Sequence, residues 1–117
     1  MKRKEYNKIK TRRERRVRER IIGTLDRPRL SVFRSNKFTS AQLIDDVNGK
    51  TIASTSSREN ISKKQNKTAG AQYVGKTIAE RAKKEGVLKA VLDRGSYRYH
   101  GRVKTLVESA RENGLQI

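Results

Sequence analysis

Apolar and polar positions alternate along the part of the chain that follows the only proline. The alternation covers residues 30–34, 38–45 and 51–55, which predicts three β-strands, because successive side chains of a strand point to opposite faces. Polar residues 35–37 separate the first two strands. Asn48-Gly49 separates the next two and is a strong hairpin signal. The three strands are therefore expected to form an antiparallel meander.

The pattern changes to helical spacing over residues 69–85, where apolar side chains recur every four positions. Asn66 or Thr68 is expected to cap the first turn of this helix, and Gly86 to follow its last turn. Gly75 lies inside the predicted helix, where glycine costs about 1 kcal/mol relative to alanine. Its presence there indicates a close approach to another backbone.

A further strand and a second helix complete the pattern. Residues 87–92 are a short apolar run that predicts a buried strand, and the apolar spacing over 103–110 predicts a helix that Asn113-Gly114 ends. The predicted order is β-β-β-α-β-α. Because strand–helix–strand crossovers are right-handed, the fourth strand is expected beside the first and parallel to it, in the order 3-2-1-4. With helices covering its faces, the fold class is α/β with a three-layer mixed sheet.

The first part of the chain has a different composition. Residues 1–29 hold 13 Lys or Arg against four Asp or Glu, which gives half of the total net charge of +18. Such a segment repels itself and has almost no apolar side chains to bury. We therefore expect residues 1–28 to be a basic arm and linker, either disordered or helical, and residues 29–117 to be the mixed α/β domain. The charge indicates a polyphosphate partner, RNA or DNA.

Composition excludes several other functions. The chain has no cysteine and a single histidine, so disulfides, thiolate metal sites and histidine metal sites are not expected. No apolar run approaches the ~20 residues of a membrane span, and residues 1–22 lack the apolar face of a helix that lies on a membrane. We expect no cofactor, no metal, no small-molecule substrate and no membrane partner, and a cytoplasmic location.

The candidate RNA contacts form four groups of mostly cationic residues. The arm contributes Lys2, Arg3, Lys4, Lys8, Lys10, Arg12, Arg13, Arg15, Arg16, Arg18 and Arg20. The turn after the first strand contributes Arg34, Ser35, Asn36 and Lys37. The polar segment before the first helix contributes Lys63, Lys64 and Lys67. The loop after the fourth strand contributes Arg94, Tyr97, Arg98, Tyr99, His100, Gly101 and Arg102.

The loop over residues 94–102 combines two features of RNA-binding surfaces. It follows the carboxyl end of a strand, the edge of an α/β sheet where ligands bind. Its tyrosines and arginines are of the types that stack on unpaired bases. Other interpretations remain open: a tyrosine can pack on the sheet, residues 34–37 can be a plain turn, and residues 63–67 can be a solvated loop.

A nuclease and a DNA-binding architectural protein are the alternative functions. The strand and helix order resembles that of nucleases that use clustered carboxylates and two metal ions. The candidate carboxylates are Asp45, Asp46 and Asp93, but adjacent residues of a strand face opposite ways, so Asp45 and Asp46 cannot easily share a metal. We therefore expect no enzymatic activity, and we expect the pair Asp45-Asp46 to lie away from RNA.

Several segments resemble one known family. They are residues 29–35, 41–46, 74–76, 93–95 with 99–103, and 110–115, and together they resemble the bacterial large-subunit ribosomal protein L18 family. The resemblance implies a mixed α/β/α domain that binds 5S rRNA and helps to attach it to the large-subunit rRNA in the central protuberance. It also implies neighbouring 5S-binding ribosomal proteins as partners, and a structural role in the large ribosomal subunit.

Overall fold

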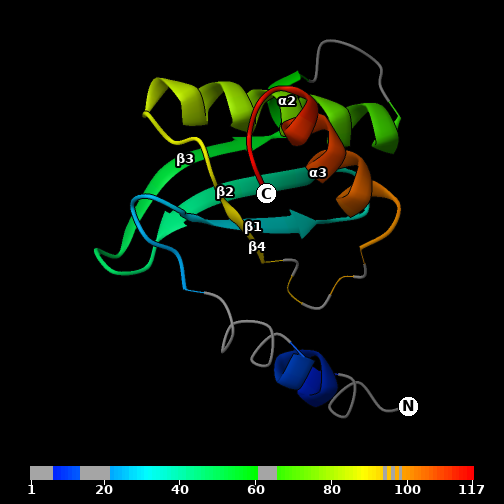
Figure 1. The fold of residues 1–117 in the computed structure, drawn as a ribbon. Helices are drawn as coiled ribbons and strands as arrows, with labels where there is room; N and C mark the ends of the chain where they lie inside the picture. Colours follow the sequence, from blue (N-terminus) through cyan, green and yellow to red (C-terminus); the bar gives the residue numbers. More distant parts are fainter. Residues whose placement is uncertain (1–6, 14–21, 61–65, 94, 96, 98) are drawn as a thin grey trace.

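The structure is a computed structural model that describes residues 7–13, 22–60, 66–93, 95, 97 and 99–117. Residues 7–13 form a helical segment of the arm, and the remaining elements follow in sequence (Figure 1). They are β1 (Arg29–Arg34), β2 (Thr39–Asp45), β3 (Lys50–Ser56), the 3-10 helix η1 (Ser57–Asn60), α2 (Lys67–Lys84), β4 (Val91–Asp93) and α3 (Arg102–Glu112).

The four strands form one sheet in the order β3-β2-β1-β4. β1 and β3 both pair antiparallel with β2, whereas β4 pairs parallel with β1. Leu30 marks the register, because it lies opposite Leu43 of β2 and Leu92 of β4. The predicted α/β class, the mixed sheet and the strand order are therefore confirmed.

Both long helices lie on the same face of the sheet (Figure 1). The core joins that face to α2 and α3 and contains Leu30, Leu43, Ile78 and Leu106, each 0 % exposed. The number of layers thus differs from the expectation: α2 and α3 share one layer, so the sheet and helices make two layers rather than three. The sequence gives the physical reason, because the other face carries Ser31, Gln42 and Ser54 around Phe33 and so offers too little apolar surface to hold a helix.

Gly75 explains how two helices fit on one face. A Cβ atom at this position would lie 2.3 Å from the carbonyl oxygen of Leu106 and 2.8 Å from Cβ of Ser109. The helices therefore approach each other more closely than any larger side chain at position 75 would permit. Ser109 joins them further, since its hydroxyl donates a hydrogen bond to the Gln72 carbonyl at 2.8 Å. The predicted close backbone approach at Gly75 is confirmed.

The fourth strand begins later than residues 87–92 predict. β4 covers Val91–Asp93, and Lys89 instead forms an isolated parallel bridge with Gln116. The amide of Ala90 donates to the Gln116 carbonyl at 2.8 Å. Residues near the carboxyl end of the chain thus satisfy the backbone before β4, a long-range contact that a short apolar run cannot reveal.

The ends of α2 follow the predicted capping chemistry. Of the two candidate caps, Asn66 takes the role, because its Oδ1 accepts a hydrogen bond from the Ala69 amide at 2.7 Å. Gly86 has a φ of +75°, which favours glycine after a helix. The polar segment before α2 begins with η1, and residues 61–65 lie outside the described residues.

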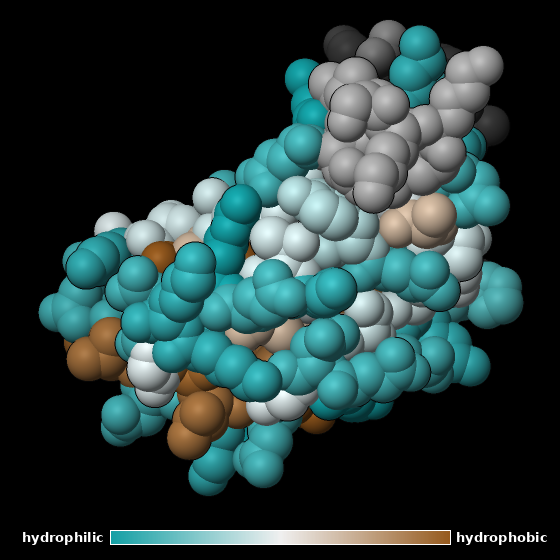
Figure 2. All heavy atoms as spheres, turned by 90° about the horizontal axis from the view of Figure 1, so that it is seen from above, coloured by the Kyte–Doolittle hydropathy of each residue, from teal (hydrophilic) through white to brown (hydrophobic). Residues whose placement is uncertain are grey.

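Seen from the helix side, the surface is mostly hydrophilic (Figure 2). Within the described ranges, no helix combines the length and the apolar character that crossing a bilayer requires.

Candidate nucleic-acid interface

The turn between β1 and β2 meets the loop after β4 at one end of the sheet. Arg102 donates a hydrogen bond from Nη1 to the Ser35 carbonyl at 2.8 Å. The Tyr97 hydroxyl lies 3.3 Å from the carbonyl oxygen of Arg34 and 3.4 Å from its amide nitrogen. Two segments about 60 residues apart in the sequence therefore form one surface, which we call the basic rim. Its described members are Arg34, Ser35, Asn36, Lys37, Tyr97, Tyr99, His100, Gly101 and Arg102.

The basic rim lies in two segments that carry no acidic residue. Residues 30–44 and residues 94–107 contain no Asp or Glu. Four acids lie instead on α2 and α3 or at the end of α2: Glu80, Glu85, Glu108 and Glu112. Cations without interspersed carboxylates produce a positive local potential, which attracts polyphosphates. The segments that form the rim therefore carry cations without a carboxylate among them, whereas the helices carry both cations and carboxylates.

Tyr97 is held in the structure by packing. Its side chain is half-buried against the hydrophobic core, and the Arg34 guanidinium carbon lies 4.9 Å from the centre of its ring. Such a cation–π contact occupies a face of the aromatic ring. The arrangement favours the interpretation that Tyr97 supports the rim from within.

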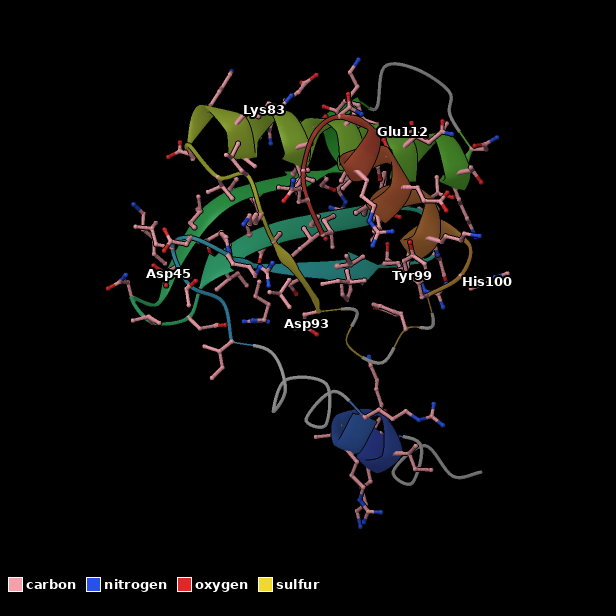
Figure 3. All side chains as sticks on the ribbon, viewed as in Figure 1. Asp45, Lys83, Asp93, Tyr99, His100 and Glu112 are labelled. Atoms are coloured by element: carbon pink, nitrogen blue, oxygen red, sulfur yellow. The ribbon has the colours of Figure 1, made fainter. Side chains whose placement is uncertain are left out.

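Tyr99 and His100 are the exposed rings of the rim. Tyr99 is 39 % exposed, and its hydroxyl lies 3.3 Å from Nη1 of Arg111 on α3. Figure 3 shows both rings at the end of the molecule opposite Asp45. Gly101 precedes α3 with a φ of +56° and no side-chain cap for its first turn. The rim thus presents two accessible rings beside the start of a helix, a position that attracts phosphate groups.

The three candidate catalytic carboxylates are not arranged around a common metal position. Asp45 is 2 % exposed and accepts hydrogen bonds from the Val47 amide at 3.1 Å and from Nδ2 of Asn48 at 2.7 Å. It therefore stabilises the turn between β2 and β3. Among the residues with a defined position, no group of three or more His, Cys, Asp and Glu could hold a metal ion.

Asp46 and Asp93 are both bound to Arg29. The Arg29 guanidinium donates from Nε and Nη2 to the two carboxylate oxygens of Asp46, each at 3.0 Å, and from Nη1 to Asp93 Oδ2 at 2.7 Å. The hydrogen bonds to Asp46 are the largest cause that raises the pKa of Arg29 above its usual value. Partial burial opposes this shift, and the hydrogen bond to Asp93 adds to it. The single charge of this permanent cation offsets one of the two negative charges, so the cluster is less acidic than two unpaired carboxylates.

Phe33 is an exposed aromatic residue that the sequence interpretation did not select. It is 58 % exposed and belongs to the face of the sheet that α2 and α3 leave uncovered. We call this the open face; it carries Ser31, Phe33, Ser40, Gln42 and Ser54. The strand alternation contained the signal, because Phe33 has the opposite parity to buried Leu30 and Val32.

The remaining predicted contacts are only partly described. The helical segment 7–13 carries Lys8, Lys10, Arg12 and Arg13, and Lys67 is the first residue of α2. The predicted contacts outside the described residues are Lys2, Arg3, Lys4, Arg15, Arg16, Arg18, Arg20, Lys63, Lys64, Arg94 and Arg98.

A mixed α/β domain with an acid-free basic rim has the properties of a nucleic-acid-binding protein. The profile of one protein family, described as ribosomal L18 of archaea, bacteria, mitochondria and chloroplasts, matches residues 3–117. The chain belongs to this ribosomal L18 family. The family resemblance of the sequence motifs is thereby confirmed.

Curated relatives agree with the family assignment. Proteins of two strains of Lactobacillus delbrueckii subsp. bulgaricus, both named large ribosomal subunit protein uL18, are 56 % identical to this chain over 112 residues. Each match covers 95 % of this chain and 94 % of the relative. The chain is therefore a structural, non-enzymatic protein of the large ribosomal subunit, located with the ribosome in the cytoplasm, with rRNA and ribosomal proteins as partners.

Proposed function

We propose that this protein binds 5S rRNA and helps to attach it to the large-subunit rRNA in the central protuberance, beside other 5S-binding ribosomal proteins. The observation that supports the proposal is the junction of two acid-free segments at the basic rim, where Arg102 binds the Ser35 carbonyl. A folded RNA offers both the phosphates and the unpaired bases that such a surface can bind.

The proposal divides the chain into two contributions. Residues 1–28 form a basic arm and linker whose cations neutralise phosphates, and residues 29–117 form a mixed α/β RNA-binding domain. Phosphate contacts supply affinity and orientation without selecting a sequence. Selectivity for 5S rRNA then depends on the rim, where Tyr99 and His100 are exposed beside Arg102. Arg102 retains guanidinium donors beyond the one that binds Ser35, because an arginine side chain has five.

A salt titration tests the proposal. Binding of the full chain to a 5S rRNA transcript, to an unrelated structured RNA of equal length and to duplex DNA is measured over a range of salt concentrations. Shape-specific binding to the 5S transcript is expected to persist at about 0.2 M salt, whereas binding through phosphates alone weakens steeply. Equal affinity for all three nucleic acids at that salt concentration would refute the proposal.

A matched pair of charge variants identifies the surface that binds. One variant replaces four cations of the helical segment with glutamine: Lys8, Lys10, Arg12 and Arg13. The control replaces four exposed cations of the helix layer and its edge: Lys76, Lys83, Lys84 and Lys89. Both variants lose the same charge, but only the first is expected to flatten the slope of log affinity against log salt, by roughly 0.7–0.9 for each phosphate that the arm no longer neutralises. Equal slopes would exclude the arm from the interface.

A further inference from the structure

Gly23 is attached to the end of β2 by a reciprocal pair of hydrogen bonds. Its amide donates to Asp46 Oδ2 at 2.7 Å, and its carbonyl accepts from the Asp46 amide at 2.9 Å. Gly23 is buried, and a Cβ atom there would lie 2.2 Å from the Ile44 carbonyl oxygen and 2.5 Å from the Arg29 amide nitrogen. The position therefore requires glycine for reasons of space.

The hydrogen bonds between Gly23 and Asp46 continue through Arg29 and Asp93 to the loop after β4. Asp46 receives two hydrogen bonds from Arg29, and Arg29 also binds Asp93 Oδ2 at 2.7 Å. The other oxygen of Asp93 accepts a hydrogen bond from the Gly95 amide at 3.0 Å, in the loop that leads to the rim. The Arg29 side chain is 13 % exposed and the Asp93 side chain 3 %, so water competes little for the bond between them, whereas the Asp46 side chain is 30 % exposed. We call Gly23, Arg29, Asp46 and Asp93 the Gly23 clamp.

From this geometry we infer that the Gly23 clamp positions the basic arm and the loop after β4 for simultaneous binding to one RNA, with Asp46 as the principal positioning residue. The inference rests on the proposed RNA-binding function and adds a role for carboxylates in it. The clamp holds the linker that follows the cationic residues of the arm, and through Asp93 it holds the start of the loop after β4. Such preorganisation reduces the ordering cost that flexible segments incur when they bind.

Charge alone makes the opposite prediction for Asp46. Asp46→Ala removes a carboxylate and raises the formal net charge above +18, so phosphate electrostatics predicts tighter RNA binding. Positioning predicts weaker binding. Gly23→Ala is an independent test of positioning, because it changes no charge but forces residue 23 away from Ile44 and Arg29. Agreement between the two variants therefore separates positioning from electrostatics.

The test measures binding of a 5S rRNA transcript to full-length wild type, Asp46→Ala and Gly23→Ala over a salt series. Both variants are expected to bind roughly 3- to 10-fold more weakly and to show a flatter salt slope, because a misdirected arm neutralises fewer phosphates. Glu59→Ala is the matched control, since it breaks the arginine–carboxylate pair with Arg81, which is not part of the clamp. The control is expected to keep the wild-type slope.

The salt slope distinguishes positioning from a loss of folding. A variant that is only less stable lowers the fraction of active protein without changing the slope of the folded molecules. Wild-type slopes in both clamp variants, or tighter binding by Asp46→Ala, would overturn the inference. If neither variant folds, amide hydrogen exchange at Gly23 in the wild-type protein decides: the clamp requires slow exchange in the absence of RNA, and unprotected exchange overturns it.

Binding by the wild-type protein distinguishes a failure of this inference from a failure of the proposed function. If the wild-type protein does not select the 5S transcript, the proposed function fails. If it selects the transcript while both clamp variants match it in affinity and slope, only the role of the clamp fails.

Discussion

The two faces of the sheet use the same strands for different purposes. In β1, Leu30 and Val32 point to the helices and are at most 5 % exposed, whereas Phe33 on the open face is 58 % exposed. The helix-covered face is held by apolar packing. The open face instead carries polar side chains, an exposed aromatic ring and the Arg29 cluster. Alternate residues of one strand are thus buried in the core or exposed to solvent, so substitutions on the two faces are expected to affect different measurements.

The largest effect is expected from the core side. Leu43 is 0 % exposed in the centre of the sheet, so Leu43→Ala should lower the free energy of unfolding by about 2–5 kcal/mol. Urea denaturation measures this decrease. RNA affinity, corrected for the folded fraction, should stay at the wild-type value. A specific loss of affinity in the folded protein would show that the two faces are not independent.

A smaller loss of stability is expected where the two helices meet. Gly75→Ala would normally favour a helix, but its Cβ would collide with the Leu106 carbonyl. We expect a net loss of roughly 1–3 kcal/mol, because overpacking forces the helices apart. Thermal unfolding measures the change. An increase in melting temperature would mean that α3 can move away from α2 at no cost.

The open face should show the reverse pattern. Phe33→Ala should change the unfolding free energy by no more than about 0.5 kcal/mol, because the ring is mostly exposed. It should weaken binding to the 5S transcript by about 1–2 kcal/mol if the ring stacks on a base. Val47→Ala is the control, since Val47 is 70 % exposed but lies in the turn between β2 and β3. Equal affinities for the two variants would remove Phe33 from the binding surface.

The smallest effect concerns how the stability contributed by the Arg81–Glu59 ion pair, beside the edge strand β3, depends on pH. Hydrogen bonds from Arg81 lower the pKa of Glu59 below its usual value near 4.5. A carboxylate with a lowered folded-state pKa stabilises the protein above its unfolded-state pKa, and this contribution disappears as the pH falls through the folded-state value.

Glu59→Gln should therefore be slightly less stable than wild type at pH 7, and the difference should narrow as the pH falls below about 4.5. Urea unfolding of both proteins at each pH measures the difference. The effect is small because both side chains are more than a third exposed to solvent. A difference that widens at low pH would contradict the assignment.

The strands and helices were largely predictable because their signals are local. Alternation identified β1 to β3, helical spacing identified α2 and α3, and the handedness of crossovers gave the strand order. The single helix layer was not predictable from helical spacing, because the spacing shows which side of a helix is apolar but not which face of the sheet that side covers. The late start of β4 depends on Gln116, a partner 27 residues from Lys89 in the sequence.

The residue types of the candidate site were predictable, but the contacts between them were not. The sequence identified the cations of the rim, yet the bond between Arg102 and Ser35 joins residues 67 positions apart. The Gly23 clamp was not predictable for a similar reason, since the sequence presents Asp46 only as a candidate metal ligand or as a residue remote from RNA. Its hydrogen bonds to Gly23 and Arg29 follow from tertiary contact and leave no periodic pattern.

The bridge between Lys89 and Gln116 also bears on how the protein is made. Leu115 is 2 % exposed in the core, and Gln116 completes the backbone pairing before β4. During translation the domain therefore cannot close until these residues have been added and have left the exit tunnel. The cationic residues 2–20 precede these residues in the chain, so they leave the tunnel before the domain can close.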